Sequence, residues 1–187
     1  MEISTTKQQL FSKDDLKKLI IPLLFEQALA ITVGMADTVM ISSAGEAAVS
    51  GVSLIDMFNN LIISVLAALA TGGAVVTSQF LGAGKKEDAC KSAKQLIVSS
   101  VCITIGISIL VMVFCNGIIS LFFGKIEADV FHNAVIYMMI SALSFPFLAL
   151  YNSCAALFRS MGNSKITLKV SVVENIINIG GNALGVC

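Results

Sequence analysis

Five long apolar segments alternate with short polar breaks along the 187 residues of the chain. Each segment reaches or exceeds the ~20 residues that an α-helix needs to cross the hydrocarbon core of a bilayer. The breaks have the glycine, serine and charged composition of loops, and lie at residues 43–46, 82–86, 124–129 and 160–164. The pattern predicts helices over residues 16–42, 47–81, 93–115, 133–158 and 166–187.

Composition places these helices in a membrane. Hydrophobic residues make up 56% of the chain and charged residues 13%, and the mean hydropathy is +0.89. Soluble domains are nearer ~45–50% apolar and ~25% charged. We therefore predict an all-α integral membrane protein, a polytopic helix bundle of about five spans over residues 19–187, with the lipid bilayer as its first partner. The formal net charge is zero, and no nucleic-acid partner is expected.

Basic residues indicate the orientation of the predicted bundle. If the five helices alternate in direction, every Lys and Arg except Lys125 falls on one side, and that side is expected to be cytoplasmic. The N-terminus is then cytoplasmic, and residues 1–18 form a short amphipathic lead-in at the membrane surface. The residues that establish the bias are Lys7, Lys13, Lys17, Lys18, Lys85, Lys86, Lys91, Lys94, Arg159, Lys165 and Lys169.

Two acids lie inside the first apolar segment. A carboxylate in hydrocarbon is costly, and such residues mark ion or proton pathways. Glu26 and Asp37 are 11 residues apart, so on a helix they point in nearly the same direction, ~16 Å apart along the axis. Pro22 precedes Glu26 by one turn and removes a backbone hydrogen bond, so we expect a hinge there. Glu26 and Asp37 are the candidate ion- or proton-coupling residues.

Polar side chains also form stripes on the second and fifth helices. Two readings stay open for the second helix: the stripe lines a watery cavity, or it bonds neighbouring helices together. The stripe on the fifth helix matches Glu26 and Asp37 in depth, so the first and fifth helices are expected to share a cavity. The candidate cavity or substrate residues are Met35, Asp56, Asn60, Glu174, Asn175, Asn178 and Asn182.

Other chemistry finds little support in the sequence. The five cysteines include no CxxC pair, and they are interpreted as small buried side chains. No zinc-ligand spacing or nucleophile–base arrangement is visible, so we expect neither an enzyme nor a bound cofactor. A non-transporting membrane assembly subunit is one alternative to a carrier.

Several segments resemble one transporter family. The first helix carries Gly34-Met35-Ala36-Asp37-Thr38-Val39-Met40-Ile41 after Pro22 and Glu26-Gln27. The second ends in Ser78-Gln79-Phe80-Leu81-Gly82-Ala83-Gly84-Lys85, and Arg159-Ser160-Met161-Gly162-Asn163-Ser164-Lys165 precedes the fifth. Together with residues 175–185, these segments are similar to the multidrug and toxic compound extrusion transporters, in the same order and at the same spans.

The resemblance implies a fold of twelve helices in two six-helix lobes, of which this chain is the amino-terminal lobe without its sixth helix. The carboxy-terminal half would then be a missing partner. It also implies export of organic, often cationic, drugs and toxic compounds across the cell membrane in exchange for H+ or Na+. Asp37 matches the coupling acid of that family, with Na+ as a possible ligand, and Asn178 and Asn182 match positions lining the cavity. A lipid-linked precursor flippase or another secondary carrier is the alternative, although no Lys or Arg lies centrally in a span to meet phosphate.

Overall fold

The computed structural model describes residues 13–42 and 45–186. The first twelve residues of the predicted lead-in, the loop residues Ser43 and Ala44, and Cys187 lie outside this range. The described residues form five α-helices and no strand, which confirms the predicted all-α bundle. The helices are α1 (Lys13–Ser42), α2 (Glu46–Gly82), α3 (Lys86–Phe123), α4 (Ala128–Ser160) and α5 (Ser164–Val186).

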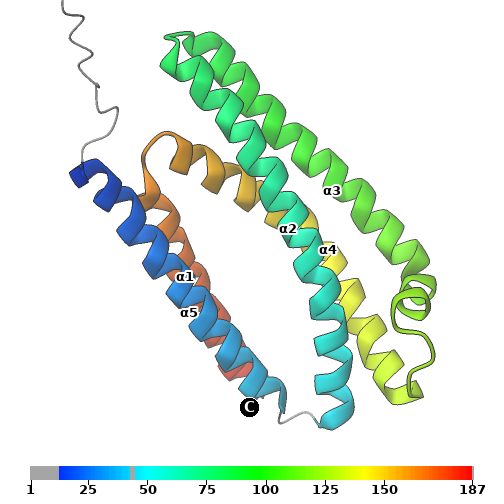
Figure 1. Ribbon diagram of the computed structural model, residues 1–187. Helices are drawn as coiled ribbons and strands as arrows, with labels where there is room; N and C mark the ends of the chain where they lie inside the picture. The colour runs from blue at the N-terminus through cyan, green and yellow to red at the C-terminus, as the bar shows by residue number, and fades with distance from the viewer. Residues whose placement is uncertain (1–12, 43–44, 187) are drawn as a thin grey trace, which may run out of the picture.

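Within the described residues, four helices are long and apolar enough to cross a membrane: α1 over Leu16–Met35, α2, α3 and α4. The 37 residues of α2 are ~55 Å long at 1.5 Å per residue, well beyond the ~30 Å hydrocarbon core. The connection between α2 and α3 projects past the connection between α4 and α5 (Figure 1). The charged start of α3, which the sequence pattern leaves outside a helix, is helical from Lys86 onward.

The bundle has two parts. Helices α2, α3 and α4 pack closely together, whereas α1 packs mainly against α5 and runs in the same direction (Figure 1). The larger part has a core of apolar side chains that includes Phe145 and Met138 of α4, Ile55 of α2 and Ile119 of α3. The second half of α4 joins this three-helix core to the α1–α5 pair.

Close approach and hydrogen bonds hold α2 against α4. A Cβ added at Gly51 would lie 3.0 Å from the backbone oxygen of Val130, so only glycine allows this spacing. One turn further, the Tyr137 hydroxyl donates to Asp56 at 2.8 Å. The Asn59 amide then donates to the Ser141 hydroxyl at 3.0 Å. Part of the polar stripe of α2 therefore bonds two helices together.

The hairpin of α2 and α3 has its own contacts. Gly73 leaves room for the side chain of Leu96, which a Cβ would meet at 2.3 Å. The Thr77 hydroxyl donates to Ser92 across the hairpin at 3.1 Å. Gly84 closes the turn with a φ of 75°, a conformation that side chains with a Cβ rarely adopt. These contacts hold the two helices together near their connection.

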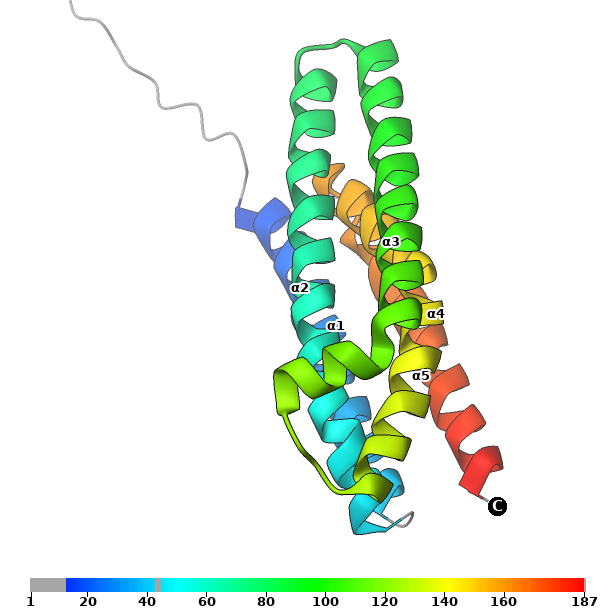
Figure 2. The same ribbon diagram turned by 90° about the vertical axis from the view of Figure 1, so that its right-hand side faces the viewer.

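Two helices change direction. α3 departs from helical geometry at Phe114 (φ −103°, ψ 16°) and then continues to Phe123, eight residues past the predicted end at Cys115. Figure 2 shows this last segment turned sharply from the rest of α3. α4 contains Pro146 and changes direction along its length (Figure 1), because proline removes a backbone hydrogen bond. Its second half thereby reaches α5.

Candidate functional site

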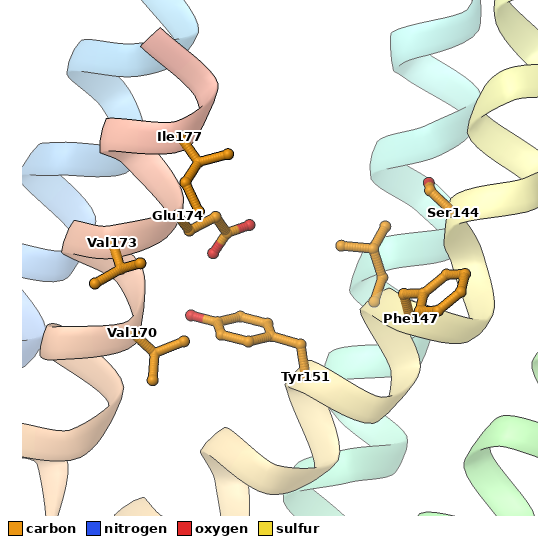
Figure 3. Close-up of a pocket in the computed structure, with 8 residues that line it drawn as sticks. Ser144, Phe147, Tyr151, Val170, Val173, Glu174 and Ile177 are labelled. Atoms are coloured by element: carbon orange, nitrogen blue, oxygen red, sulfur yellow. The ribbon is translucent and has the colours of Figure 1, made fainter. Parts of the chain in front are cut away.

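A cavity of about 430 Å³ lies between the second half of α4 and the first half of α5. Seven of its eight lining side chains are uncharged, and the eighth is Glu174. Figure 3 shows the carboxylate of Glu174 and the ring of Tyr151 facing one another across this space. The lining residues are Ser144, Phe147, Leu148, Tyr151, Val170, Val173, Glu174 and Ile177.

Glu26 is the most buried acid near the cavity. It lies on α1 with only 8% of its surface exposed, although its neighbours Phe25 and Leu24 are well exposed. Its Oε2 atom is buried and has no hydrogen-bond partner among the described residues. A buried carboxyl oxygen without a partner is costly and unusual, so it is a candidate for binding something not present in the structure.

Three helices bring Glu26, Tyr151 and Glu174 together. Tyr151 of α4 lies within electrostatic reach of the Glu26 carboxylate of α1. Glu174 of α5 is within electrostatic reach of both. Arg159, two turns further along α4, places a positive charge within electrostatic reach of Tyr151. We call Glu26, Tyr151 and Glu174 the acidic cluster.

Two of the candidate residues predicted from the sequence, Glu26 and Glu174, therefore lie within electrostatic reach of each other. Asn175 lies beside them on α5, half-buried, and its amide nitrogen has no partner among the described residues. The helices that carry Glu26 and Glu174 pack side by side, as the matched depth of their stripes predicts. The cavity described above lies between α4 and α5, and a cavity shared by the first and fifth helices stays a prediction.

The other candidates lie elsewhere or cannot be placed. Asp56 is bonded to Tyr137 in the interface with α4, while Asn60, Met35 and Asn178 are exposed on the described chain. The side chains of Asp37 and Asn182 lie outside the described residues, although their backbones belong to α1 and α5. The hinge predicted at Pro22 falls inside a helix that continues from Lys13 to Ser42.

Sequence reasoning missed Tyr151 and Pro146. The signal for Tyr151 was a hydroxyl inside an apolar helix, since a buried tyrosine usually has a hydrogen-bond partner. Pro146 is the second of only two prolines in the chain and lies in the middle of a predicted span. No periodicity could indicate that its bend carries Tyr151 to α5, because that depends on how the helices pack.

The described residues contain no group of three or more His, Cys, Asp or Glu side chains that could hold a metal ion.

Comparison with known proteins places these features in context. The sequence matches the MatE family over residues 22–184. It is 32% identical over 186 residues to the "Uncharacterized transporter YisQ" of Bacillus subtilis (strain 168), which covers 94% of this chain and 40% of that protein. It is 25% identical over 172 residues to the "Probable multidrug resistance protein NorM" of Thermotoga maritima, covering 89% of this chain and 36% of that protein.

A solved structure has the same fold. It is described as "Reverse polarity of binding pocket suggests different function of a MOP superfamily transporter from Pyrococcus furiosus Vc1 (DSM3638)". The TM-score is 0.82 at 20% sequence identity, over 90% of this chain and 37% of that chain. The present chain therefore spans about two fifths of the length of the proteins it matches.

Proposed function

Because the chain belongs to the MatE family and is a multi-pass membrane protein, we propose that it is the amino-terminal part of a secondary transporter. The proposed transporter exports small organic cations across the cell membrane, driven by H+ or Na+ moving the other way. The likeness to a protein named as a probable multidrug resistance protein supports drugs and toxic compounds as the cargo. The N-terminus is proposed to lie on the cytoplasmic side.

The cavity between α4 and α5 carries the proposal for the substrate. A site with apolar walls and a few placed polar groups binds small molecules through burial and fixes them through those groups. Here the one charged lining side chain is an acid, Glu174, and the rings of Phe147 and Tyr151 offer aromatic faces to a cation. A phosphate-bearing lipid precursor would require basic groups in these walls, where the lining has none.

Coupling is proposed to reside in the acids of α1. Glu26 is buried and partly unpartnered, and Asp37 lies three turns further along the same helix. An acid that exchanges a proton or Na+ changes its charge, and two arrangements of the helices with different affinities then alternate. The inward movement of the ion drives the outward movement of the cation.

Flux measurements test the proposal directly. We would reconstitute the full-length gene product in lipid vesicles and follow ethidium, a fluorescent organic cation, under an imposed H+ gradient and, separately, an imposed Na+ gradient. We expect one gradient to drive ethidium against its own concentration difference. Flux that is indifferent to both gradients would contradict ion coupling, and absence of ethidium flux with retained phospholipid-precursor transport would favour a flippase.

A substitution locates the coupling. We expect Asp37→Asn to keep expression and to abolish gradient-driven ethidium flux. Asp129→Asn is the matched control, because Asp129 is exposed in the first turn of α4 and its contact to Asn133 uses the backbone oxygen, which the change preserves. Gradient-driven flux at the parent rate in Asp37→Asn would remove Asp37 from the mechanism.

A further inference from the structure

We propose that residues 115–123, the last segment of α3, lie flat in the interface of the bilayer, where the lipid headgroups meet the acyl chains. In this position the segment presents Leu121 and Phe122 to lipid, and the first turns of α2 and α4 project beyond the hydrocarbon on the same side. The proposal concerns a surface of the protein that binds lipid, and it does not depend on the proposed transport function.

The part of α3 that precedes this segment has the length of one membrane crossing. Lys94 is exposed near the charged start of the helix, and Phe114, where the backbone departs from helical geometry, follows it by 20 residues. At 1.5 Å per residue this stretch is ~30 Å long, which equals the thickness of the hydrocarbon core. A helix that begins its crossing at Lys94 therefore reaches the opposite interface at Phe114, where α3 turns.

Exposed apolar side chains mark the same level on the two neighbouring helices. Counted from the start of each helix, the first large apolar side chain that is exposed is Met57 on α2 and Ile136 on α4. In the described stretches before them, 46–56 and 128–135, the large apolar side chains are buried or partly buried. Exposed apolar surface is unfavourable in water and not in lipid, so the hydrocarbon begins near Met57 and Ile136.

Polar groups lie at this level and beyond it. The Tyr137 hydroxyl of α4 donates to Asp56 of α2 at 2.8 Å, and both residues directly adjoin the first exposed apolar side chains. Tyrosine is enriched at membrane–water interfaces, where its ring is in the apolar layer and its hydroxyl reaches polar groups. Further out, the exposed side chains of α2 and α4 include Glu46, Asp129 and His132.

The last segment of α3 lies at the level where the exposed apolar side chains begin. It turns across the bundle (Figure 2), and the Phe122 ring meets the Phe58 ring of α2 edge to face, with the ring centroids 5.8 Å apart. Cys115 and Ile119 fix the segment to the core that α2 and α4 share. Leu121 nevertheless remains 82% exposed and Phe122 59% exposed, so the segment offers apolar surface on the side away from the core.

The segment also has the two flanks of an interfacial helix. At ~100° per residue, Asn116 and Ser120 lie on one side of its buried face, and Leu121 and Phe122 lie on the other. An interfacial helix keeps its polar flank toward water and buries its apolar side chains ~5–10 Å into the boundary between headgroups and acyl chains. Lipid therefore covers Leu121 and Phe122, while Asn116 and Ser120 stay hydrated.

Electron paramagnetic resonance tests the depth of the segment. In the full-length gene product in lipid nanodiscs, an azide-bearing amino acid at position 121 is linked to a nitroxide, and its collisions with O2, which concentrates in hydrocarbon, are compared with those of a water-soluble nickel chelate. The same label at Ile105, exposed in the middle of the α3 crossing, and at Glu127, exposed before α4, gives the two limits. We expect the O2-to-nickel ratio at position 121 to lie about threefold below that at Ile105 and about threefold above that at Glu127. A ratio equal to that at Ile105 would place the segment inside the hydrocarbon, and a ratio equal to that at Glu127 would leave it in water, open to a protein partner; either result would overturn the proposal.

Lysine substitutions test the placement without a label. In L121K the ammonium group can extend from the interface into water along its apolar stem, whereas in I105K the charge lies in the middle of the hydrocarbon, where it is costly. We expect the yield of monodisperse protein in size-exclusion chromatography to stay within about twofold of the parent for L121K and to fall about fivefold or more for I105K. An equally large fall in both variants would contradict the interfacial position of Leu121.

Discussion

The contact between α2 and α4 at Gly51 gives the sharpest prediction of stability. In Gly51→Ala the new Cβ would lie 3.0 Å from the Ala134 backbone nitrogen, 3.0 Å from the Val130 carbonyl oxygen and 3.1 Å from Asn133 Cβ. Two of these three atoms are backbone and cannot rotate away, so the helices must separate by a few tenths of an ångström. Overpacking of this kind destabilises a protein by ~1–3 kcal/mol.

The same helix offers a matched control. At Gly72 an added Cβ meets nothing within 4 Å, so Gly72→Ala changes only the helix propensity and is expected to stabilise by ~0.5–1 kcal/mol. Gly51→Ala gains the same propensity, so the two alanine variants should differ by the overpacking alone, ~1–3 kcal/mol in the free energy of unfolding.

The assay is equilibrium unfolding of the full-length gene product in mixed micelles by increasing SDS, followed by far-ultraviolet circular dichroism. Size-exclusion chromatography after heating gives an independent ranking of the variants. If Gly51→Ala and Gly72→Ala unfold within ~0.5 kcal/mol of each other, the spacing of α2 and α4 does not depend on the missing Cβ.

Three further predictions concern α4 and its partners. In a double-mutant cycle of Asn59→Ala and Ser141→Ala, the coupling energy should be ~0.6 kcal/mol, the mean for hydrogen bonds between membrane helices, and zero coupling in SDS unfolding would exclude the bond. Tyr137→Phe should lower the free energy of unfolding more in the parent than in an Asp56→Asn variant, because the Tyr137 hydroxyl donates to the Asp56 carboxylate. Equal losses in the two backgrounds would contradict this. Pro146→Ala should raise stability while lowering ethidium flux severalfold, because a straighter α4 carries its second half away from α5; unchanged flux would show that the bend is not needed.

Much of the fold follows from the sequence because a membrane imposes simple rules. The apolar length of the segments predicts five helices, and the described residues form five. The residues at which the helices begin and end are less predictable. α3 begins at Lys86 among charged residues and α4 begins at Ala128, because backbone hydrogen bonds continue a helix past the edge of the hydrocarbon. The departure at Phe114 has no proline or glycine at that position to indicate it.

The candidate site was predictable only in part. The facing direction and depth of Glu26 and Glu174 follow from helical geometry, and the helices that carry them pack against each other. The direction in which the α2 stripe faces does not follow, because a polar stripe satisfies its hydrogen bonds equally well with water or with a neighbouring helix. Asp56 and Asn59 bond to α4, whereas Asn60 on the same stripe is exposed. Tyr151 enters the site only through the bend of α4.

The pairing of α1 with α5 has a consequence for how the chain is made. About 120 residues separate the end of α1 from the start of α5, which at ~5–20 residues per second takes roughly 6–25 s to synthesise. During that interval α2, α3 and α4 can already assemble with one another, while α1 is in the membrane without α5, the helix that it mainly packs against. Glu26 is then exposed to lipid or to the insertion machinery. The biogenesis of the bundle therefore depends on the first helix being held until the fifth emerges to cover it.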